Sequence, residues 1–356
     1  MGKEFNELNK RFQTLISKKE SFEEGKEILL ELRKNMYDML MLVQNGFNPT
    51  GFSLMPFKNS NGYESKTMAY SIYHIIRIED IVCHTLIKND EQVFEKNDYQ
   101  NRLGIDIKST GNELNKEEVG LFSKKINLSE LYNYLSDVYS ESNKMIKELR
   151  FDDLKKKISP MKKDYLLNSS CVSNNESAVW LIDYWCNKNV LGLLKMPFSR
   201  HWIMHVDAFL KIKNKLIQNA KKETKNKISV CGFSCNHCFL SMWCGSCRSE
   251  YNCCSYGTLF EGNVCPNVKC AKEKGYEGCY DCPNLDSCEV GFYKKDNEDG
   301  IAAKTNAMFI RQYGKKNLVL ALDEMHKHFD YKKMQEMVAQ NKLEILVKYM
   351  KDAKKE

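Results

Sequence analysis

Cysteine is concentrated in one stretch of this 356-residue chain, from Cys231 to Cys288. Twelve of the fifteen cysteines lie there, and C-x2-C pairs recur among them. Two cysteines at this spacing on a tight turn present both sulfurs to one side, as tetrahedral zinc sites and iron–sulfur clusters require. All twelve are therefore candidate ligands of zinc or of an iron–sulfur cluster: Cys231, Cys235, Cys238, Cys244, Cys247, Cys253, Cys254, Cys265, Cys270, Cys279, Cys282 and Cys288.

These cysteines could form disulfides, bind structural zinc or bind an iron–sulfur cluster. Disulfides require an oxidising compartment, and the polar N-terminal stretch MGKEFNELNKRFQTLISKKE has no apolar segment typical of a signal peptide. Structural zinc is favoured, because it would hold together a segment too poor in aliphatic residues to fold by apolar burial alone. An iron–sulfur cluster is the alternative, since Cys231-x3-Cys235-x2-Cys238 has the spacing used by radical S-adenosylmethionine enzymes, although too few residues follow for the barrel of that class.

Histidines of the N-terminal half form a second candidate site. His201 and His205 are four residues apart on an expected helix, so both imidazoles leave the same face one turn apart and can bind one ion. His74, among the apolar residues of an earlier helix, is the candidate third ligand. The alternative is that His201 hydrogen-bonds near a helix start and His74 is a core histidine. Three neutral imidazoles would leave an open coordination position, as in catalytic zinc, and would also accept iron, nickel or manganese.

Long amphipathic helices are expected to position these histidines. Apolar residues recur at helical spacing in four long stretches, at residues 21–43, 65–88, 129–149 and 200–220. A polar connection with short helical turns is expected at residues 89–125, an irregular segment at 151–175 and a further helix at 177–193. Ser199 is the expected N-cap of the last long helix. This pattern predicts a mainly α fold built on a four-helix bundle.

The chain is expected to divide into three parts. A linker rich in lysine and asparagine, KKETKNK, follows the last long helix. The parts expected are a helical bundle at residues 1–225, a small cysteine-rich domain stabilised by metal or cluster at 226–315, and C-terminal helices at 316–356.

The order of the histidines resembles the DinB-like superfamily of four-helix bundles. His74, in SIYHIIRIE, and the late His201-x3-His205 are similar to the three-histidine metal site of that superfamily. Glu79 stands where these proteins tend to have an acidic residue, which makes it a candidate catalytic residue or a hydrogen-bond acceptor for His74; a solvent-exposed carboxylate is the alternative. The resemblance spans about residues 20–220. It implies thiol-dependent S-transfer or amide hydrolysis, with a small-molecule substrate or a low-molecular-weight thiol as partner.

The cysteine-rich segment is similar to an uncharacterised family of small microbial cysteine-rich domains. The resemblance rests on the motifs CGFSCNHC, WCGSCRS and CPNVKCAKEKGYEGCYDCPNLDSC and covers about residues 230–317. It implies binding of a metal or a cluster.

The composition of the chain disfavours two classes of function, nucleic-acid binding and membrane insertion. The net charge of +7, from 54 basic and 47 acidic residues, is mild, and the cysteine-rich segment mixes Glu and Asp with its lysines, which disfavours nucleic acid as a partner. No apolar run approaches the roughly 18 residues of a membrane span, and a cytoplasmic protein is expected. With the candidate three-histidine site, the resemblance to the DinB-like superfamily implies a metal-dependent enzyme of thiol transfer or hydrolysis. The alternative is a metal- or thiol-responsive binding protein.

Overall fold

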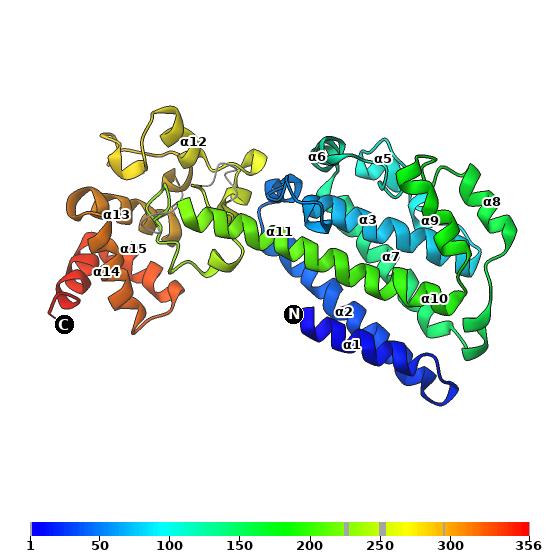
Figure 1. Cartoon of the computed structure of the whole chain (residues 1–356). Helices are drawn as coiled ribbons and strands as arrows, with labels where there is room; N and C mark the ends of the chain where they lie inside the picture. Colours follow the sequence, from blue (N-terminus) through cyan, green and yellow to red (C-terminus); the bar gives the residue numbers. More distant parts are fainter. Residues whose placement is uncertain (1, 224–227, 249–253, 295, 356) are drawn as a thin grey trace. The chain divides into compact units, whose positions relative to one another are not determined.

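The computed structural model describes residues 2–223, 228–248, 254–294 and 296–355 of the chain (Figure 1). The described chain is mainly helical, which confirms the predicted fold class at this level. It forms two compact units: unit 1 comprises residues 1–44 and 52–213, and unit 2 comprises residues 45–51 and 214–356. The cysteine-rich segment and the C-terminal helices therefore belong to the same unit. Candidate ligand Cys253 and residues 224–227 of the expected linker lie outside the described residues.

Unit 1 contains long helices joined by short ones. Along the chain they are α1 (Gly2–Leu15), α2 (Phe22–Gly46), α3 (Met68–Asp80), α4 (Val93–Lys96), α5 (Tyr99–Leu103), α6 (Lys116–Lys125), α7 (Leu128–Glu148), α8 (Pro160–Asn168), α9 (Glu176–Cys186), α10 (Val190–Leu194) and α11 (His201–Glu223). Helix α3 continues as a π-helix over Ile81–Lys88, and α11 is preceded by a π-helical turn over Met196–Arg200. The division between the two units falls within α11.

Helix α3 is the central element of unit 1. Thr67 caps its start, because the side-chain hydroxyl accepts a hydrogen bond from the backbone N–H of Tyr70 at 3.0 Å. Every residue of α3 is buried, so this helix is enclosed by its neighbours on all sides. Asn89 ends the π-helical continuation in the left-handed conformation, with φ of 61°.

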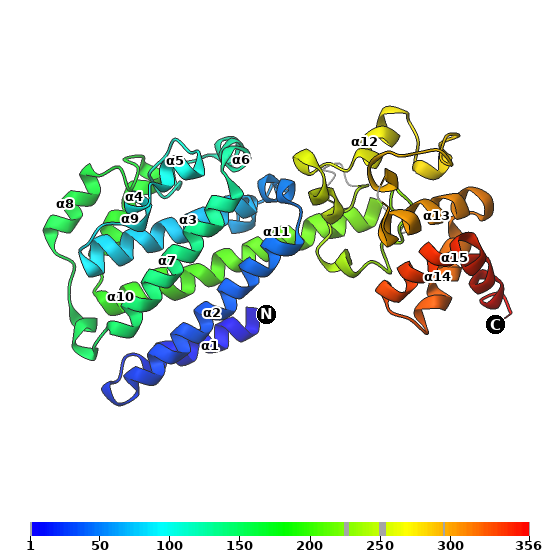
Figure 2. The same cartoon turned by 180° about the vertical axis from the view of Figure 1, so that it is seen from behind.

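A buried polar network joins the four long helices α2, α3, α7 and α11, which run alongside one another in both views (Figures 1 and 2). Arg33 on α2 forms a bidentate ion pair with Glu79 on α3, with both N–O distances at 2.7 Å. Ser142 on α7 donates to Glu79 at 2.6 Å, and the indole N–H of Trp202 on α11 does so at 2.6 Å. Because all four side chains are fully buried, the network fixes how these helices pack.

Two details of the connections differ from the sequence prediction. The segment expected to be irregular at residues 151–175 contains α8, which begins at Pro160, a residue whose fixed φ suits the first helical position. Ser199 is not an N-cap. Its hydroxyl donates to the carbonyl of Leu194 at 3.1 Å, because the π-helical turn already carries the chain into α11.

Unit 2 has a core of aromatic, aliphatic and cysteine side chains. Its helices are α12 (Pro266–Glu273), α13 (Glu298–Tyr313), α14 (Lys315–His326) and α15 (Tyr331–Asp352). Helix α15 packs against both α13 and α14. Gly232 has φ of 97°, and its backbone approaches α13 so closely that an added Cβ would lie 2.8 Å from the carbonyl oxygen of Ala303. Within the described ranges, no helix combines the length and the apolarity needed to cross a bilayer.

Candidate metal centre

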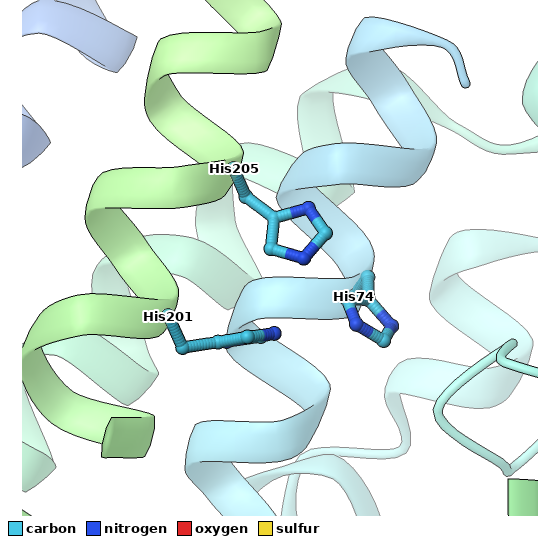
Figure 3. Close-up of side chains that lie close together, drawn as sticks. All are labelled: His74, His201 and His205. Carbon is cyan, nitrogen blue, oxygen red and sulfur yellow. The ribbon is translucent and has the colours of Figure 1, made fainter. Parts of the chain in front are cut away.

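Three histidine side chains of unit 1 converge on one point (Figure 3). His74 comes from the middle of α3, and His201 and His205 come from the first two turns of α11. One nitrogen from each ring lies within 4.8 Å of the others, and the ring centroids are 4.5–5.1 Å apart. All three are buried, with exposures of 5%, 7% and 3%. The structure therefore brings together the three residues that the sequence selected.

Burial keeps these imidazoles neutral. It lowers the pKa of His74 to about 4, against the effect of the hydrogen bond to the carbonyl of Thr110. Burial also lowers the pKa of His201 and His205 well below the ordinary value, and the neighbouring histidines act in the same direction. A neutral imidazole has a free lone pair for a metal, so these side chains are in the protonation state that coordination requires.

The backbone orients His74. Its Nδ1 atom lies 2.8 Å from the carbonyl oxygen of Thr110, which fits an Nδ1–H donor and leaves Nε2 with a free lone pair. The interpretation of Glu79 as an acceptor for His74 is wrong, and so is the alternative of an exposed carboxylate. Glu79 is fully buried, and its oxygens accept from Arg33, Ser142 and Trp202. These contacts make Glu79 part of the packing of the long helices.

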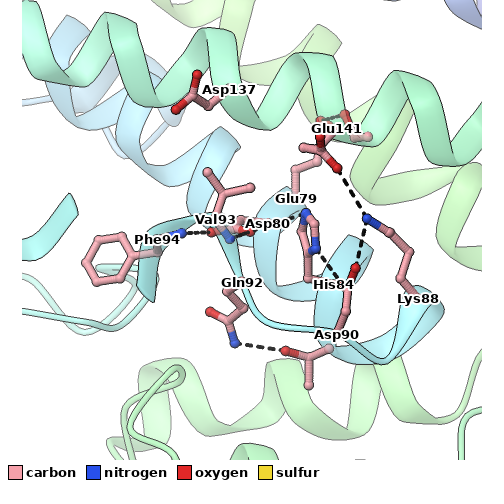
Figure 4. A network of polar contacts seen from close by, with 12 residues as sticks. Glu79, Asp80, His84, Lys88, Asp90, Gln92, Val93, Phe94, Asp137 and Glu141 are labelled. Carbon is pink, nitrogen blue, oxygen red and sulfur yellow. Dashed lines mark hydrogen bonds and ion pairs between the residues drawn. The ribbon is translucent and has the colours of Figure 1, made fainter. Parts of the chain in front are cut away.

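His84, ten residues after His74, belongs to a different network (Figure 4). Its Nδ1 atom lies 2.6 Å from a carboxylate oxygen of Asp90. The nearby Asp80 accepts from the backbone N–H groups of Val93 and Phe94, both at 2.9 Å. This network holds the connection after the π-helical segment against α3, so it supports the fold around the histidines.

Aromatic and basic side chains surround the histidines. Tyr70 stacks on His74 with ring centroids 5.4 Å apart, and the half-exposed Tyr63 meets His205 edge-on at 4.9 Å. The half-buried Lys66 places its ammonium 5.1 Å from the ring centroid of Tyr70. Burial lowers the pKa of Lys66, and the charge of Lys116 does so further. The sequence did not single out these residues. Tyr70 could have been found, because it lies four residues before His74 and therefore on the same face of the helix.

The donor set fits a divalent transition metal. The three rings offer imidazole nitrogens, the ligands that zinc, iron, nickel and other such ions accept. Within the described part of the chain, the buried Nδ1 atoms of His201 and His205 have no hydrogen-bond partner, which is costly for buried polar atoms. Three protein ligands also leave a position open, the arrangement of catalytic zinc sites.

The described cysteines of unit 2 gather around two cavities. The four-cysteine cavity has a volume of about 260 Å³ and is lined by Cys270, Cys279, Cys282 and Cys288. The seven-cysteine cavity has a volume of about 230 Å³ and is lined by Cys231, Cys235, Cys238, Cys244, Cys247, Cys254 and Cys265. All eleven are free thiols, buried or half-buried. Sequence spacing gave the candidate ligands, and the fold divides them into these two groups.

Hydrogen bonds to sulfur occur in the seven-cysteine cavity. The backbone N–H of Val230 donates to Cys247 Sγ at 3.3 Å, and those of Ser246 and Ser255 donate to Cys244 Sγ at 3.4 and 3.3 Å. The thiol of Cys254 and these two amides lower the pKa of Cys244 to about 6, against the effect of burial. Such donors stabilise thiolates, the form in which cysteine binds metals.

The chain matches no family model, no curated protein and no solved structure. The features of the chain that bear on its function are the convergence of the three histidines and the clustering of the cysteines.

Proposed function

We propose that this protein is a metal-dependent enzyme whose reaction takes place at His74, His201 and His205, in a DinB-like four-helix bundle. The observation that carries the proposal is the convergence of three buried, neutral imidazoles from two helices, with nitrogens within 4.8 Å of one another. A histidine that serves only as a core residue does not need two other histidines beside it. In addition, the buried Nδ1 atoms of His201 and His205 have no hydrogen-bond partner among the described residues.

The reaction class is thiol transfer or hydrolysis. A metal ion on three imidazoles lowers the pKa of a bound water or thiol and so supplies a hydroxide or thiolate at neutral pH. The protein supplies the surroundings of that nucleophile. Lys66 brings a positive charge beside Tyr70 and His74, which favours an anionic nucleophile or an anionic substrate group at this site. Tyr63 is half-exposed against His205, so it lies where a small molecule would enter.

A metal- or thiol-responsive binding protein is the second candidate. The lowered pKa of Cys244 favours it, because a thiol with a pKa of about 6 is largely thiolate at pH 7 and binds metals or reacts readily. In this alternative the histidine centre would bind its ligand without turnover.

The test is His201→Ala in the full chain, purified without oxygen and analysed for metal content per chain. We expect this variant to lose one equivalent of metal relative to the parent chain while the metal bound by the cysteines stays. The control is His328→Ala, because His328 has an exposed side chain in unit 2 and should leave the metal content unchanged. Retention of all metal by His201→Ala contradicts a histidine centre, and unfolding of unit 1 makes the histidines structural.

Activity then separates the two candidate functions. The metal-loaded parent chain is assayed with small amides, and with electrophiles plus cysteine as thiol donor. Turnover by the parent chain that is lost in His201→Ala supports the enzyme. Binding of thiols without turnover in either assay supports the binding protein.

A further inference from the structure

The eleven described cysteines of unit 2 fall into two sets, one around each cavity. Helix α12 divides them, since Cys265 precedes its first residue and lines the seven-cysteine cavity, whereas Cys270 lies within it and lines the four-cysteine cavity. The fully buried Asn267 contacts both sets: it accepts from Cys265 Sγ at 3.7 Å and donates to Cys279 Sγ at 3.9 Å. A buried amide with a sulfur partner on each side fixes the wall between the cavities.

The spacing of the sulfurs suits a polynuclear group better than a single ion. Tetrahedral zinc holds each sulfur at about 2.3 Å, so the four sulfurs stand about 3.8 Å apart. Among the described residues, the ligand atoms close enough to hold one ion are those of His74, His201 and His205, and the cysteine sulfurs form no such group. A [4Fe–4S] cluster carries its four thiolates on four different iron atoms, so its sulfurs stand further apart than those on one ion.

The four-cysteine cavity has the space and the apolar wall that such a cluster needs. Its volume of about 260 Å³ exceeds the volume of one ion many times over. Ala271 and Leu285 supply buried apolar wall, which keeps water from the cluster. Lys274 and Glu289 both line this cavity, so the lining carries one charge of each sign.

We propose that Cys270, Cys279, Cys282 and Cys288 hold one [4Fe–4S] cluster in the four-cysteine cavity, and that four of the seven cysteines lining the other cavity hold a second, separate [4Fe–4S] cluster. The proposal replaces structural zinc, which the spacing of the cysteines in the sequence had favoured. It is independent of the histidine centre, because the clusters lie in unit 2 and the histidines in unit 1.

The first experiment measures the full chain after anaerobic reconstitution with equal amounts of ferrous and ferric iron, and with sulfide, in the presence of equimolar zinc. We expect about eight labile sulfide ions per chain, together with a brown colour, since each [4Fe–4S] cluster contains four. Labile sulfide is the decisive quantity, because a metal ion bound by histidines alone contains none. Colourless protein that holds zinc without labile sulfide overturns the proposal, and this result requires no variant.

The second experiment separates the two cavities. The double variant Cys282→Ser, Cys288→Ser should retain about four labile sulfide ions per chain, half of the parent value. The matched variant Cys231→Ser, Cys247→Ser should lose the other half, and the control Cys186→Ser, in unit 1, should keep the full amount. Each is compared with the parent chain by circular dichroism. Loss of all sulfide in a double variant with an unchanged helical spectrum overturns the division into two clusters, and so does retention of all sulfide in both.

Discussion

Replacing Glu79 by glutamine should destabilise unit 1 without removing the histidine-bound metal. Each carboxylate oxygen accepts two hydrogen bonds: Oε1 from Arg33 and Ser142, and Oε2 from Arg33 and Trp202. Whichever oxygen becomes an amide nitrogen in Glu79→Gln, two donors lose their acceptor, and the buried guanidinium of Arg33 loses its counter-charge. Breaking a buried ion pair from one side costs about 3–5 kcal/mol. We expect a decrease of that size in the free energy of unfolding.

The assay is urea denaturation at pH 7 followed by tryptophan fluorescence. Three of the four tryptophans, Trp180, Trp185 and Trp202, lie in unit 1, so the signal reports mainly on this unit. The control is Asp38→Asn, which removes the partner of Lys34 in an ion pair with side-chain exposures of 67% and 53%. Exposed pairs of this kind contribute less than about 1 kcal/mol.

Two further results would test this interpretation of Glu79. The double variant Arg33→Met, Glu79→Leu should recover most of the lost stability, because apolar residues often replace a buried ion pair at little cost. Metal content per folded chain should be the same in Glu79→Gln as in the parent chain, since the carbonyl of Thr110 orients His74. Unchanged stability combined with loss of metal or activity would refute the structural role and return Glu79 to the catalytic centre.

Two other predictions concern pH and backbone conformation. The pKa of His74 is 6.5 ordinarily and about 4 in the fold, so the unfolded chain binds more protons below pH 6.5. Between pH 7 and 5 the metal-free protein should lose about 2 kcal/mol of its free energy of unfolding through His74 alone, and His201 and His205, whose pKa values are also lowered, should add to this loss. Urea titrations of metal-stripped protein at both pH values measure this loss, and equal stabilities would contradict the buried neutral histidine. Gly232→Ala should unfold unit 2 and release its metal, because the new Cβ would lie 2.8 Å from backbone atoms of α13. Gly275→Ala is the matched control: its φ is also positive, at 69°, but no atom lies within 4 Å of the added Cβ, so only about 1–2 kcal/mol is expected from the left-handed conformation. Thermal denaturation and metal analysis of both variants decide this, and equal effects would refute the steric argument.

The two units carry different candidate ligands, histidines in unit 1 and cysteines in unit 2, and these suit different roles in the proposed enzyme. The histidine centre holds neutral nitrogen ligands on rigid helices, an arrangement suited to a metal that binds and activates a small molecule. The two cysteine cavities are lined by thiols from many short segments, which suits cofactors that also stabilise the fold. Removal of the proposed clusters should therefore affect the folding of unit 2 first.

Several features of this protein followed from the sequence because they depend on local periodicity. The spacing of His201 and His205 put both rings on one face of a helix, since residues four apart are neighbours on any α-helix. The apolar repeat around His74 made that helix buried, and burial made His74 a candidate partner. The density of cysteines between Cys231 and Cys288 indicated ligands, because free thiols are rarely so frequent in an ordinary core.

Other features were decided by the tertiary structure, because they join residues far apart in the chain. Thr110 orients His74 through its backbone carbonyl, an atom that every residue carries and that leaves no signal in the sequence. Glu79 was a plausible catalytic carboxylate until the packing of α2 against α3 brought Arg33 to it. The grouping of the cysteines likewise depends on how α12 divides them, which their spacing along the chain does not determine. Spacing specifies which side chains share a local face, whereas the partner that each buried polar group finds depends on how distant segments pack.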